Sequence, residues 1–218
     1  MLDVNRDSYL CVDRRQFEAL GPWLQGWDEK PSDSPCNGSA PPDEAIALAK
    51  KLLGLGILSE RAEGAKPARP TPFSLPTQAV DDNLPEYSRG SVWTRALAFF
   101  LDAARASRQL RDQSFESTIA CVQARKQRAS PARPLDSQPA RSALSAFHRL
   151  RLFYPRPYLC LFDSLALVHF LARFRLYPDW VFGVRADPFE AHCWVQAGSV
   201  VLNDTLERVS AFTPIMSV

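Results

Sequence analysis

Three residues in the last third of the sequence have the types and spacing of a nucleophile with its activating partners. Cys160 follows a proline-containing loop and stands in the first turn of a predicted apolar helix, where the helix dipole lowers the pKa of a thiol. His192 lies on a predicted strand of a hairpin whose second strand ends near Asp204. A carboxylate beside an imidazole fixes its tautomer and stabilises its charged form. The three residues therefore predict a Cys-His-Asp site for nucleophilic catalysis. The structural alternative is a buried cysteine, a hydrogen-bonded histidine and a turn aspartate.

The position of the carboxylate depends on the loop of that hairpin. We expect a three-residue loop with Gly198 in the left-handed conformation, which places His192 opposite Asp204 on the neighbouring strand. Backbone N–H groups at the start of the helix that begins at Cys160 are the candidates for holding a developing oxyanion.

The other imidazoles and thiols favour structural roles. Cys193 is a competing thiol, but side chains alternate along a strand, so it faces away from His192. His148 and His169 lie within helical patterns, where a structural or surface role is usual. The 5 cysteines form no CxxC pair, which fits neither a disulfide framework nor a zinc site, so no metal is predicted.

The elements around these residues indicate an α+β fold, with helices followed by antiparallel strands. Residues 160–174 are apolar around most of the helix circumference, which is typical of a buried helix. Strands are predicted at residues 180–185, 192–195 and 199–202. Upstream helical patterns occur around residues 92–103 and 119–123 and over residues 140–152.

Residues 1–63 predict a small winged-helix-like module, made of a hairpin, two helices and a closing strand. Its expected ranges are 2–4 and 9–12 for the hairpin, 15–24 and 43–53 for the helices, and 57–59 for the strand. Residues 64–88 are rich in Pro, Ala, Thr and Ser, and we interpret them as a linker or an extended arm. Residues 89–218 remain for the second domain.

The charge is divided unevenly along the chain, although the formal net charge is only +2. Residues 1–88 carry 9 basic and 14 acidic residues, residues 89–156 carry 13 and 4, and residues 157–218 carry 4 and 6. A winged-helix-like module next to a basic segment raises the alternative of a nucleic-acid-binding regulator. Because the module itself is acidic, no nucleic-acid partner is expected.

Neither a secretory signal nor a membrane span is apparent in the sequence. The first residues lack a basic region followed by an apolar region and a cleavage site, and no apolar run approaches about 20 residues. A cytoplasmic location is therefore the default expectation. The sequence has no GxxxxGK[ST] motif, so we expect neither a phosphate-binding loop nor ATP use by this chain.

The C-terminal motifs resemble those of a known family. They are CLFDSLAL at 160–167, VFGVR at 181–185, PFEAHCWV at 188–195 and VLND at 201–204. In order and spacing they are similar to the C-terminal domain of the lasso peptide biosynthesis B proteins, which are transglutaminase-like cysteine peptidases. The resemblance implies a papain/transglutaminase-like domain. It also puts the catalytic residues of the family on Cys160, His192 and Asp204, and it includes Arg185 and Asn203 without assigning them a role.

The same resemblance implies a function and partners. The substrate would be a lasso precursor peptide, and the reaction would be cleavage of its leader segment from the core, without a cofactor. Ring closure would belong to a partner, an asparagine-synthetase-like cyclase. We hypothesise that Arg105, Arg108 and Arg111 of the basic segment dock this cyclase or an acidic stretch of the precursor.

The N-terminal module resembles the leader-recognition element of that family. The similar stretches are residues 2–12 and 47–58, and the usual strand before this hairpin has no counterpart, so either the start is truncated or the sheet has one strand fewer. The resemblance implies that the leader adds as a strand to an exposed sheet edge. The implied leader-binding residues are Tyr9, Leu10, Cys11 and Val12 on the docking strand and Leu48, Lys51 and Leu52 in the groove.

Two further functions stay open at the level of sequence. Transglutaminase-type acyl transfer uses the same acyl-enzyme and differs only in the nucleophile that enters, which the residues do not decide. The family resemblance favours water. A catalytically silent binding protein would keep the N-terminal module and lack a matched triad, whereas this sequence has all three residues.

Overall fold

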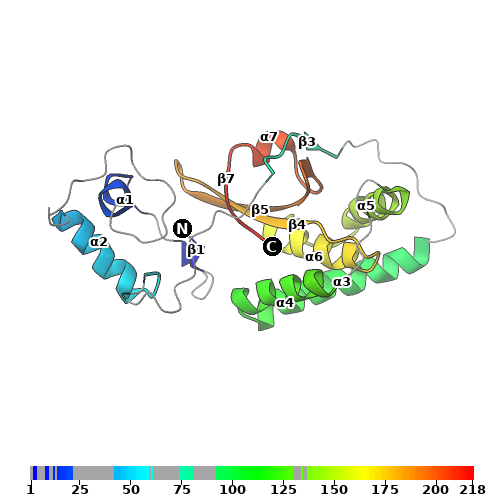
Figure 1. Ribbon diagram of the computed structural model, residues 1–218. Coiled ribbons are helices and arrows are strands. Elements are labelled where there is room, and N and C mark those ends of the chain that lie inside the picture. The colour runs from blue at the N-terminus through cyan, green and yellow to red at the C-terminus, as the bar shows by residue number, and fades with distance from the viewer. Residues whose placement is uncertain are drawn as a thin grey trace. The chain divides into compact units, whose positions relative to one another are not determined.

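The computed structural model describes residues 2–3, 8–9, 12, 14–21, 42–58, 60, 74–80, 92–129, 134 and 137–218. The chain divides into two units, Met1–Pro70 and Thr71–Val218. Figure 1 shows the elements of each unit. Within the described ranges, no helix combines the length and the apolar character needed to cross a membrane.

The first unit contains a hairpin and two helices. Their bounds are β1 (Leu2–Asp3), β2 (Ser8–Tyr9), α1 (Arg14–Leu20) and α2 (Asp43–Gly54), with β1 and β2 antiparallel. Helix α2 begins after Pro42 with two acidic residues in its first turn, where unpaired N–H groups and the helix dipole favour them. Leu20 of α1 packs with Ala45, Leu48 and Leu52 of α2 to form the core.

The prediction of a strand at residues 57–59 is wrong at Ile57 and Leu58, the two of these positions that the structure describes. Ile57 and Leu58 form a bend after α2. Their backbone N–H groups both donate to the carbonyl of Leu52, at 2.9 and 3.3 Å. Gly56 permits this helix ending because its φ is 71°. The N–H groups that a strand would pair are therefore used to close the helix.

The second unit is an α+β domain with helices on a mixed five-stranded sheet. The strand order is β3-β6-β5-β4-β7, with β3 parallel to β6 and the other neighbours antiparallel. The helices are α3 (Val92–Asp112), α4 (Phe115–Arg128), α5 (Gln138–Arg151), α6 (Cys160–Ala172) and α7 (Leu206–Val209). The strands are β3 (Gln78–Ala79), β4 (Asp179–Arg185), β5 (Glu190–Ala197), β6 (Val200–Val201) and β7 (Thr213–Ser217).

The sheet differs from the expected antiparallel one at both edges. Strand β3 comes from the segment interpreted as a linker or arm, and residues 74–80 of that segment lie along β6. Gln196 anchors this arm by donating from Nε2 to the carbonyl of Ser74 at 2.6 Å. Strand β7 was not predicted, because Pro214 interrupts its apolar pattern, and its pairing with β4 shifts register near Gly183.

Helix α6 is the central helix of the unit, as its all-round apolar sequence predicts. Its residues from Phe162 to Leu171 are buried. It packs against β5 on one side and α3 on the other, an arrangement visible in Figure 1. Phe170 of α6 lies 6.3 Å from Phe99 of α3 and 5.7 Å from Phe147 of α5, ring centre to ring centre. Aromatic contacts therefore fix α6 against the outer helices.

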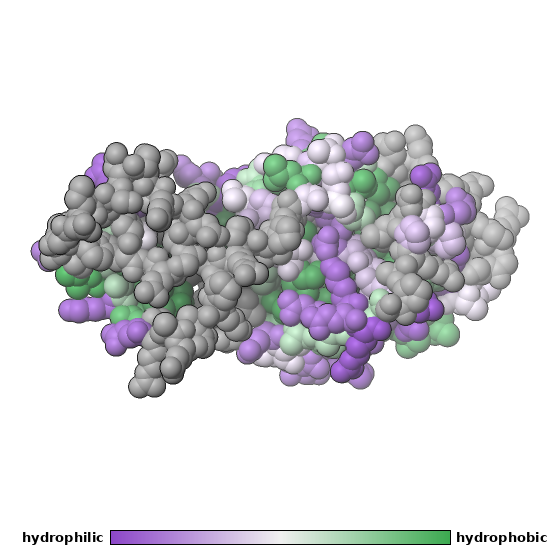
Figure 2. All heavy atoms as spheres, in the orientation of Figure 1, coloured by the Kyte–Doolittle hydropathy of each residue, from purple (hydrophilic) through white to green (hydrophobic). Residues whose placement is uncertain are grey.

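The outer side of α3 stays exposed. Trp93, Leu97 and Leu101 keep more than half of their surface accessible, and the exposed Arg105 and Arg108 follow on the same helix. Figure 2 shows green hydrophobic side chains at the surface of the second unit among purple hydrophilic ones. The outer side of α3 is thus apolar in its first half and basic in its second half.

The hairpin loop between β5 and β6 has two residues instead of the expected three. Ala197 pairs with Val200, and Gly198 opens the loop with a φ of 59°. The shorter loop changes the register, and β6 ends before its pairing can reach His192. Strand pairing therefore does not place Asp204. The chain instead bends through residues 202–204, and this bend carries the carboxylate to the imidazole.

Gly183 gives the first test of this packing. It pairs with His192 across β4 and β5, and a Cβ there would lie 2.9 Å from the ring of Trp194 and 3.0 Å from Cβ of Phe212. Because Trp194 is fully buried, it cannot move aside freely. We predict that Gly183→Ala lowers the free energy of unfolding by about 1–3 kcal/mol through overpacking, measured by urea denaturation.

A matched control for Gly183→Ala is Gly54→Ala, because an added Cβ at Gly54 meets no atom within 4 Å. The control variant should unfold close to the wild type. Equal stability of Gly183→Ala and the wild type would contradict the predicted clash.

Candidate active site

The three residues predicted for catalysis lie on three elements of the second unit. Cys160 is the first residue of α6, His192 lies within β5, and Asp204 lies in the bend that follows β6. The imidazole is hydrogen-bonded to Asp204, and the Cys160 thiol is close enough to shift its pKa. The structure therefore brings together residues that are 32 and 12 positions apart in the sequence.

His192 and Asp204 form the best-defined contact of the site. His192 Nε2 donates to Asp204 Oδ2 at 2.5 Å, and the two side chains are 1% and 8% exposed. The second carboxylate oxygen accepts from the N–H of Thr205 at 2.8 Å. Trp194 and Phe212 flank the imidazole, with ring centres at 6.1 and 5.0 Å. Since Nε2 is occupied by Asp204, Nδ1 is the nitrogen left to face the thiol.

Two side chains from other elements hold the backbone of the bend. His148 Nε2, on α5, donates to the carbonyl of Leu202 at 2.8 Å, and the Tyr158 hydroxyl donates to the carbonyl of Asn203 at 2.8 Å. Burial and the nearby Asp204 carboxylate raise the pKa of Tyr158, so its hydroxyl keeps the proton that it donates. His148 thus has a structural contact, in the bend that positions the carboxylate.

Among the described residues, no strand pairs with the edge of β5 beyond β6. Groups of the bend and of α6 form hydrogen bonds to this edge instead. The N–H of Leu202 donates to the carbonyl of Val195 at 2.8 Å, and the N–H of Val195 donates to Asn203 Oδ1 at 2.7 Å. Asn203 Nδ2 reaches across to Ser164 Oγ at 2.9 Å, and Ser164 donates to the carbonyl of Cys193 at 3.3 Å. Asn203, to which the sequence assigned no role, therefore ties the bend to both β5 and α6.

The thiol and the imidazole shift each other's protonation in opposite directions. Hydrogen bonds from Cys193 and from His192 lower the pKa of the Cys160 thiol to about 4. Burial lowers the pKa of His192, but the hydrogen bonds and charges of Asp204 and Cys160 outweigh it and raise that pKa to about 9. Between these two values the site holds a thiolate beside an imidazolium, which is the reactive form of a cysteine nucleophile.

Cys193 contributes to the site in a way that the sequence reasoning missed. Alternation along β5 sends its side chain to the other side of the strand from His192, and this is the side on which α6 packs. There the Cys193 thiol is close enough to Cys160 to affect its pKa. Both thiols are free. Side chains alternate along β5 as predicted, and Cys160 nevertheless interacts with both His192 and Cys193.

A buried carboxylate organises the helix start that carries the thiol. Asp163 is 1% exposed, and its Oδ2 accepts from the N–H of Leu159 at 2.7 Å. Arg151 donates to the same carboxylate from Nε and Nη2. The ion pair neutralises Asp163, so the carboxylate can close the first turn of α6 without placing an unpaired negative charge beside the Cys160 thiolate.

Arg151 also holds the loop that precedes the thiol. Its guanidinium atoms Nη1 and Nη2 both donate to the carbonyl of Arg156 at 3.2 Å, and Nη2 also donates to the carbonyl of Pro157 at 3.1 Å. The guanidinium also lies 5.8 Å from the ring centre of Tyr154 and 5.9 Å from that of Tyr158. One side chain thus orders the proline-containing loop.

The residues expected to bind a leader on the first hairpin are placed in part. Tyr9 lies in β2. Val12 is half-buried against the core of the first unit. Leu10 and Cys11 lie outside the described residues.

The three expected groove positions on α2 differ from one another. Leu48 and Leu52 are 6% and 3% exposed and belong to the core of the first unit. Lys51 is exposed. Side chains that fill a core leave little surface for a ligand, so Lys51 is the position of the three with accessible atoms.

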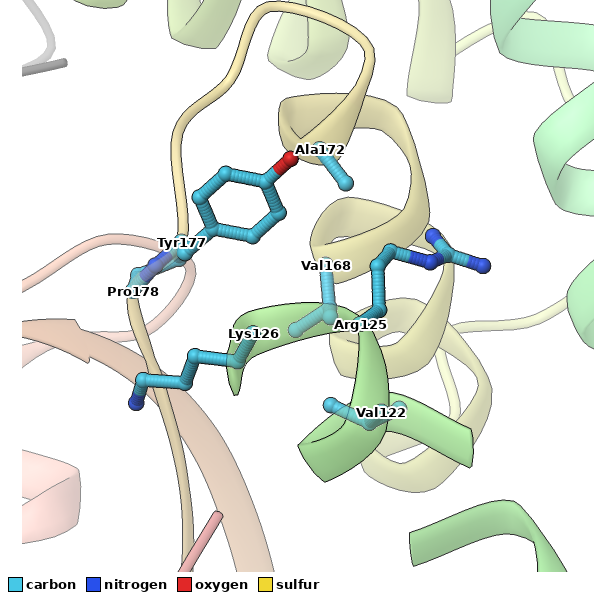
Figure 3. A pocket seen from close by; sticks show the side chains of 7 residues that line it. All are labelled: Val122, Arg125, Lys126, Val168, Ala172, Tyr177 and Pro178. Atoms are coloured by element: carbon cyan, nitrogen blue, oxygen red, sulfur yellow. The ribbon is translucent and has the colours of Figure 1, made fainter. Parts of the chain in front are cut away.

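A small apolar hollow lies at the opposite end of α6 from Cys160 (Figure 3). Its lining residues are Val122, Arg125, Lys126, Val168, Ala172, Tyr177 and Pro178. The two cations in this lining already have partners, because Arg125 donates to His169 Nδ1 at 3.0 Å and Lys126 binds Asp179. Burial and the arginines around it lower the pKa of His169 to about 3, so its imidazole is neutral and structural.

Within the described ranges, no group of three His, Cys, Asp or Glu side chains is arranged to hold a metal ion.

Comparison with known proteins gives one family match. The family model of the transglutaminase-like superfamily matches residues 95–217. No curated protein and no solved structure matches the chain. The matched residues run from α3 to the end of β7 and include every residue of the site described above.

The ion pair at the site predicts how the thiol titrates. We expect the alkylation rate of Cys160 by iodoacetamide to fall with a midpoint near pH 4, because only the thiolate reacts and the pKa is lowered to about 4. His192→Ala removes one hydrogen bond and one positive charge, so its midpoint should move to higher pH. Peptide mass spectrometry follows the modification. A wild-type midpoint close to the ordinary value of 9.0 would contradict the ion pair.

The buried ion pair between Arg151 and Asp163 predicts a stability effect. Asp163→Ala should lower the free energy of unfolding by about 3 kcal/mol, because Arg151 then lies partly buried without its partner. Asp163→Asn keeps an oxygen for the N–H of Leu159 and should cost less. Thermal and urea unfolding measure both variants, and an Asp163→Ala protein as stable as the wild type would rule out this role.

Proposed function

The chain belongs to the transglutaminase-like superfamily, and from this premise we propose that Cys160, His192 and Asp204 act together as the triad of a cysteine peptidase. Membership implies a cysteine-dependent peptidase or acyltransferase. The observation that carries the proposal is the thiolate and imidazolium pair at the start of α6, with the imidazole held by Asp204.

The first half of the reaction forms an acyl-enzyme. The Cys160 thiolate attacks the carbonyl carbon of the scissile amide, and the carbonyl oxygen becomes an oxyanion. Leu159, the residue before α6, provides no side-chain cap, so the N–H groups in the first turn of α6 are our candidates for holding this oxyanion. His192 gives its proton to the leaving amine, the C–N bond breaks, and a thioester remains on Cys160.

The second half of the reaction releases the acyl group. The neutral His192 takes a proton from water, the water oxygen attacks the thioester, and the C–S bond breaks to return the thiolate and the imidazolium. Asp204 keeps the imidazole oriented in both halves through Nε2. An amine that entered in place of water would give acyl transfer with the same triad.

We further propose that the substrate is a lasso precursor peptide, cut between its leader and its core. The support is the order and spacing of the four C-terminal motifs, which are similar to those of the lasso peptide biosynthesis B proteins. In this proposal the first unit binds the leader through the edge of β2 near Tyr9 and through α2 near Lys51. The partner is an asparagine-synthetase-like cyclase. The basic half of α3, where Arg105, Arg108 and Arg111 are exposed, would dock this cyclase or an acidic stretch of the precursor.

The proposed reaction is tested by cleavage of a precursor peptide followed by mass spectrometry. Cys160→Ala should abolish cleavage, because the nucleophile is lost. It should keep its affinity for the leader, because the residues proposed to bind the leader lie in the other unit. His192→Ala should reduce cleavage nearly as much, since both the proton donor and the thiolate partner are removed.

His169→Ala is the matched control, because it changes a histidine in the last turn of α6, at the end away from Cys160. Its cleavage rate should stay far above that of His192→Ala. Release of core peptide by Cys160→Ala at the wild-type rate would sink the mechanism. Addition of a primary amine distinguishes the two outcomes of the acyl-enzyme: a free carboxylate in the product indicates hydrolysis, and an amide to the added amine indicates transfer.

A further inference from the structure

Cys193 lies beside the proposed nucleophile, and no bond to its sulfur forms or breaks in the mechanism above. It is 2% exposed, and its side chain is close enough to Cys160 for each thiol to shift the pKa of the other. Both thiols are free. The site therefore contains two neighbouring thiols, and hydrolysis or acyl transfer uses only one of them as a nucleophile.

The geometry of α6 and β5 fixes this contact independently. Ser164 lies one turn after Cys160 on the same side of the helix. Its hydroxyl donates to the carbonyl of Cys193 at 3.3 Å and accepts from Asn203 Nδ2 at 2.9 Å. Cys160, one turn closer to the helix start and on the same side of α6, therefore faces the same part of β5. Two successive turns of α6 thus hold Cys193.

The two thiols differ in protonation and access. Cys160 is a half-buried thiolate at the surface end of α6. Burial raises the pKa of Cys193 well above its ordinary value, so Cys193 stays protonated. An oxidant from solution reacts with an accessible thiolate and not with a buried thiol. Cys160 is therefore the first of the two to be oxidised.

We propose that Cys160 and Cys193 form a reversible disulfide when a peroxide oxidises the site. In the first step the Cys160 sulfur attacks hydrogen peroxide, an S–O bond forms, the O–O bond breaks, and hydroxide leaves. In the second step the Cys193 sulfur attacks the sulfenic sulfur of Cys160, the S–O bond breaks, and the hydroxyl group leaves as water with the proton of Cys193. The two sulfurs together supply the two electrons that reduce the peroxide.

The disulfide adds a redox property that goes beyond the proposed function. It removes the Cys160 thiolate and therefore stops catalysis of either kind. It also prevents oxidation of Cys160 to the sulfinic acid, which thiols do not reverse. A thiol reductant returns both residues to the starting state.

The test uses the full chain with Cys11, Cys36 and Cys121 changed to Ser, so that the thiols of Cys160 and Cys193 alone remain. After treatment with hydrogen peroxide, the intact monomer should lose the mass of two hydrogen atoms and have no thiol left to alkylate. Dithiothreitol should restore both. In the wild type, non-reducing tryptic digestion should link the peptides 152–173 and 186–208. This second measurement decides the matter if the serine background does not fold.

The matched control is Cys193→Ser in the same background. Without a resolving thiol, Cys160 should gain the mass of one oxygen atom and then of two, and dithiothreitol should recover little of the thiol after long exposure. The proposal is overturned if the protein with both thiols follows this same course, or if the linked peptides are absent from the wild type. Neither measurement requires a substrate, so failure here leaves the proposed peptidase activity untouched, and failure of that activity leaves this result standing.

Discussion

The unpaired edge of β5 is the constraint on which the site depends. Strand β6 covers only the end of β5, and backbone N–H and C=O groups are costly to bury without partners. In the bend after β6, the N–H of Leu202 donates to the carbonyl of Val195, and Asn203 Oδ1 accepts from the N–H of Val195. Ser164 of α6 donates to the carbonyl of Cys193. These contacts bring the bend and the first turns of α6 to the same few residues of β5. The groups that complete the strand edge therefore also bring the thiol, the imidazole and the carboxylate together.

Two aspartates near the thiol have opposite electrostatic roles. Asp204 is hydrogen-bonded to His192 and stabilises its positive charge. Asp163 lies closer along the chain to Cys160, but Arg151 neutralises it, and it serves the backbone of the helix start. The Asp163 carboxylate thus has a cation of its own, and the His192 imidazolium is left to interact with Asp204 and with the Cys160 thiolate.

The parts of the site that the sequence predicts are those determined by residue type and local pattern. The apolar circumference of α6 predicts a buried helix, and the helix start marks the thiol. The register of the hairpin was wrong by one position, since the pattern around Gly198 allows a loop of two residues or three. Strand β3 is too short to show an alternating pattern of apolar residues in the sequence. Pro214 interrupts that pattern in β7, so neither strand was predicted. The contacts of Asn203 and Cys193 depend on how a bend and a helix meet a strand edge, which no local pattern encodes.

The guanidinium of Arg151 has a consequence for how a ligand would be received. Its N–H groups are used on a carboxylate and on backbone carbonyls of the loop at Arg156 and Pro157. The loop is therefore ordered before any peptide arrives, and little conformational entropy remains to be lost there on binding. Tyr158 and Leu159 lie on this fixed loop with about half of their surface exposed. The Tyr158 hydroxyl also holds the bend that carries Asp204. Leu159 is therefore the one of the two side chains that can change without disturbing the contact between His192 and Asp204, while the backbone beneath it keeps its shape.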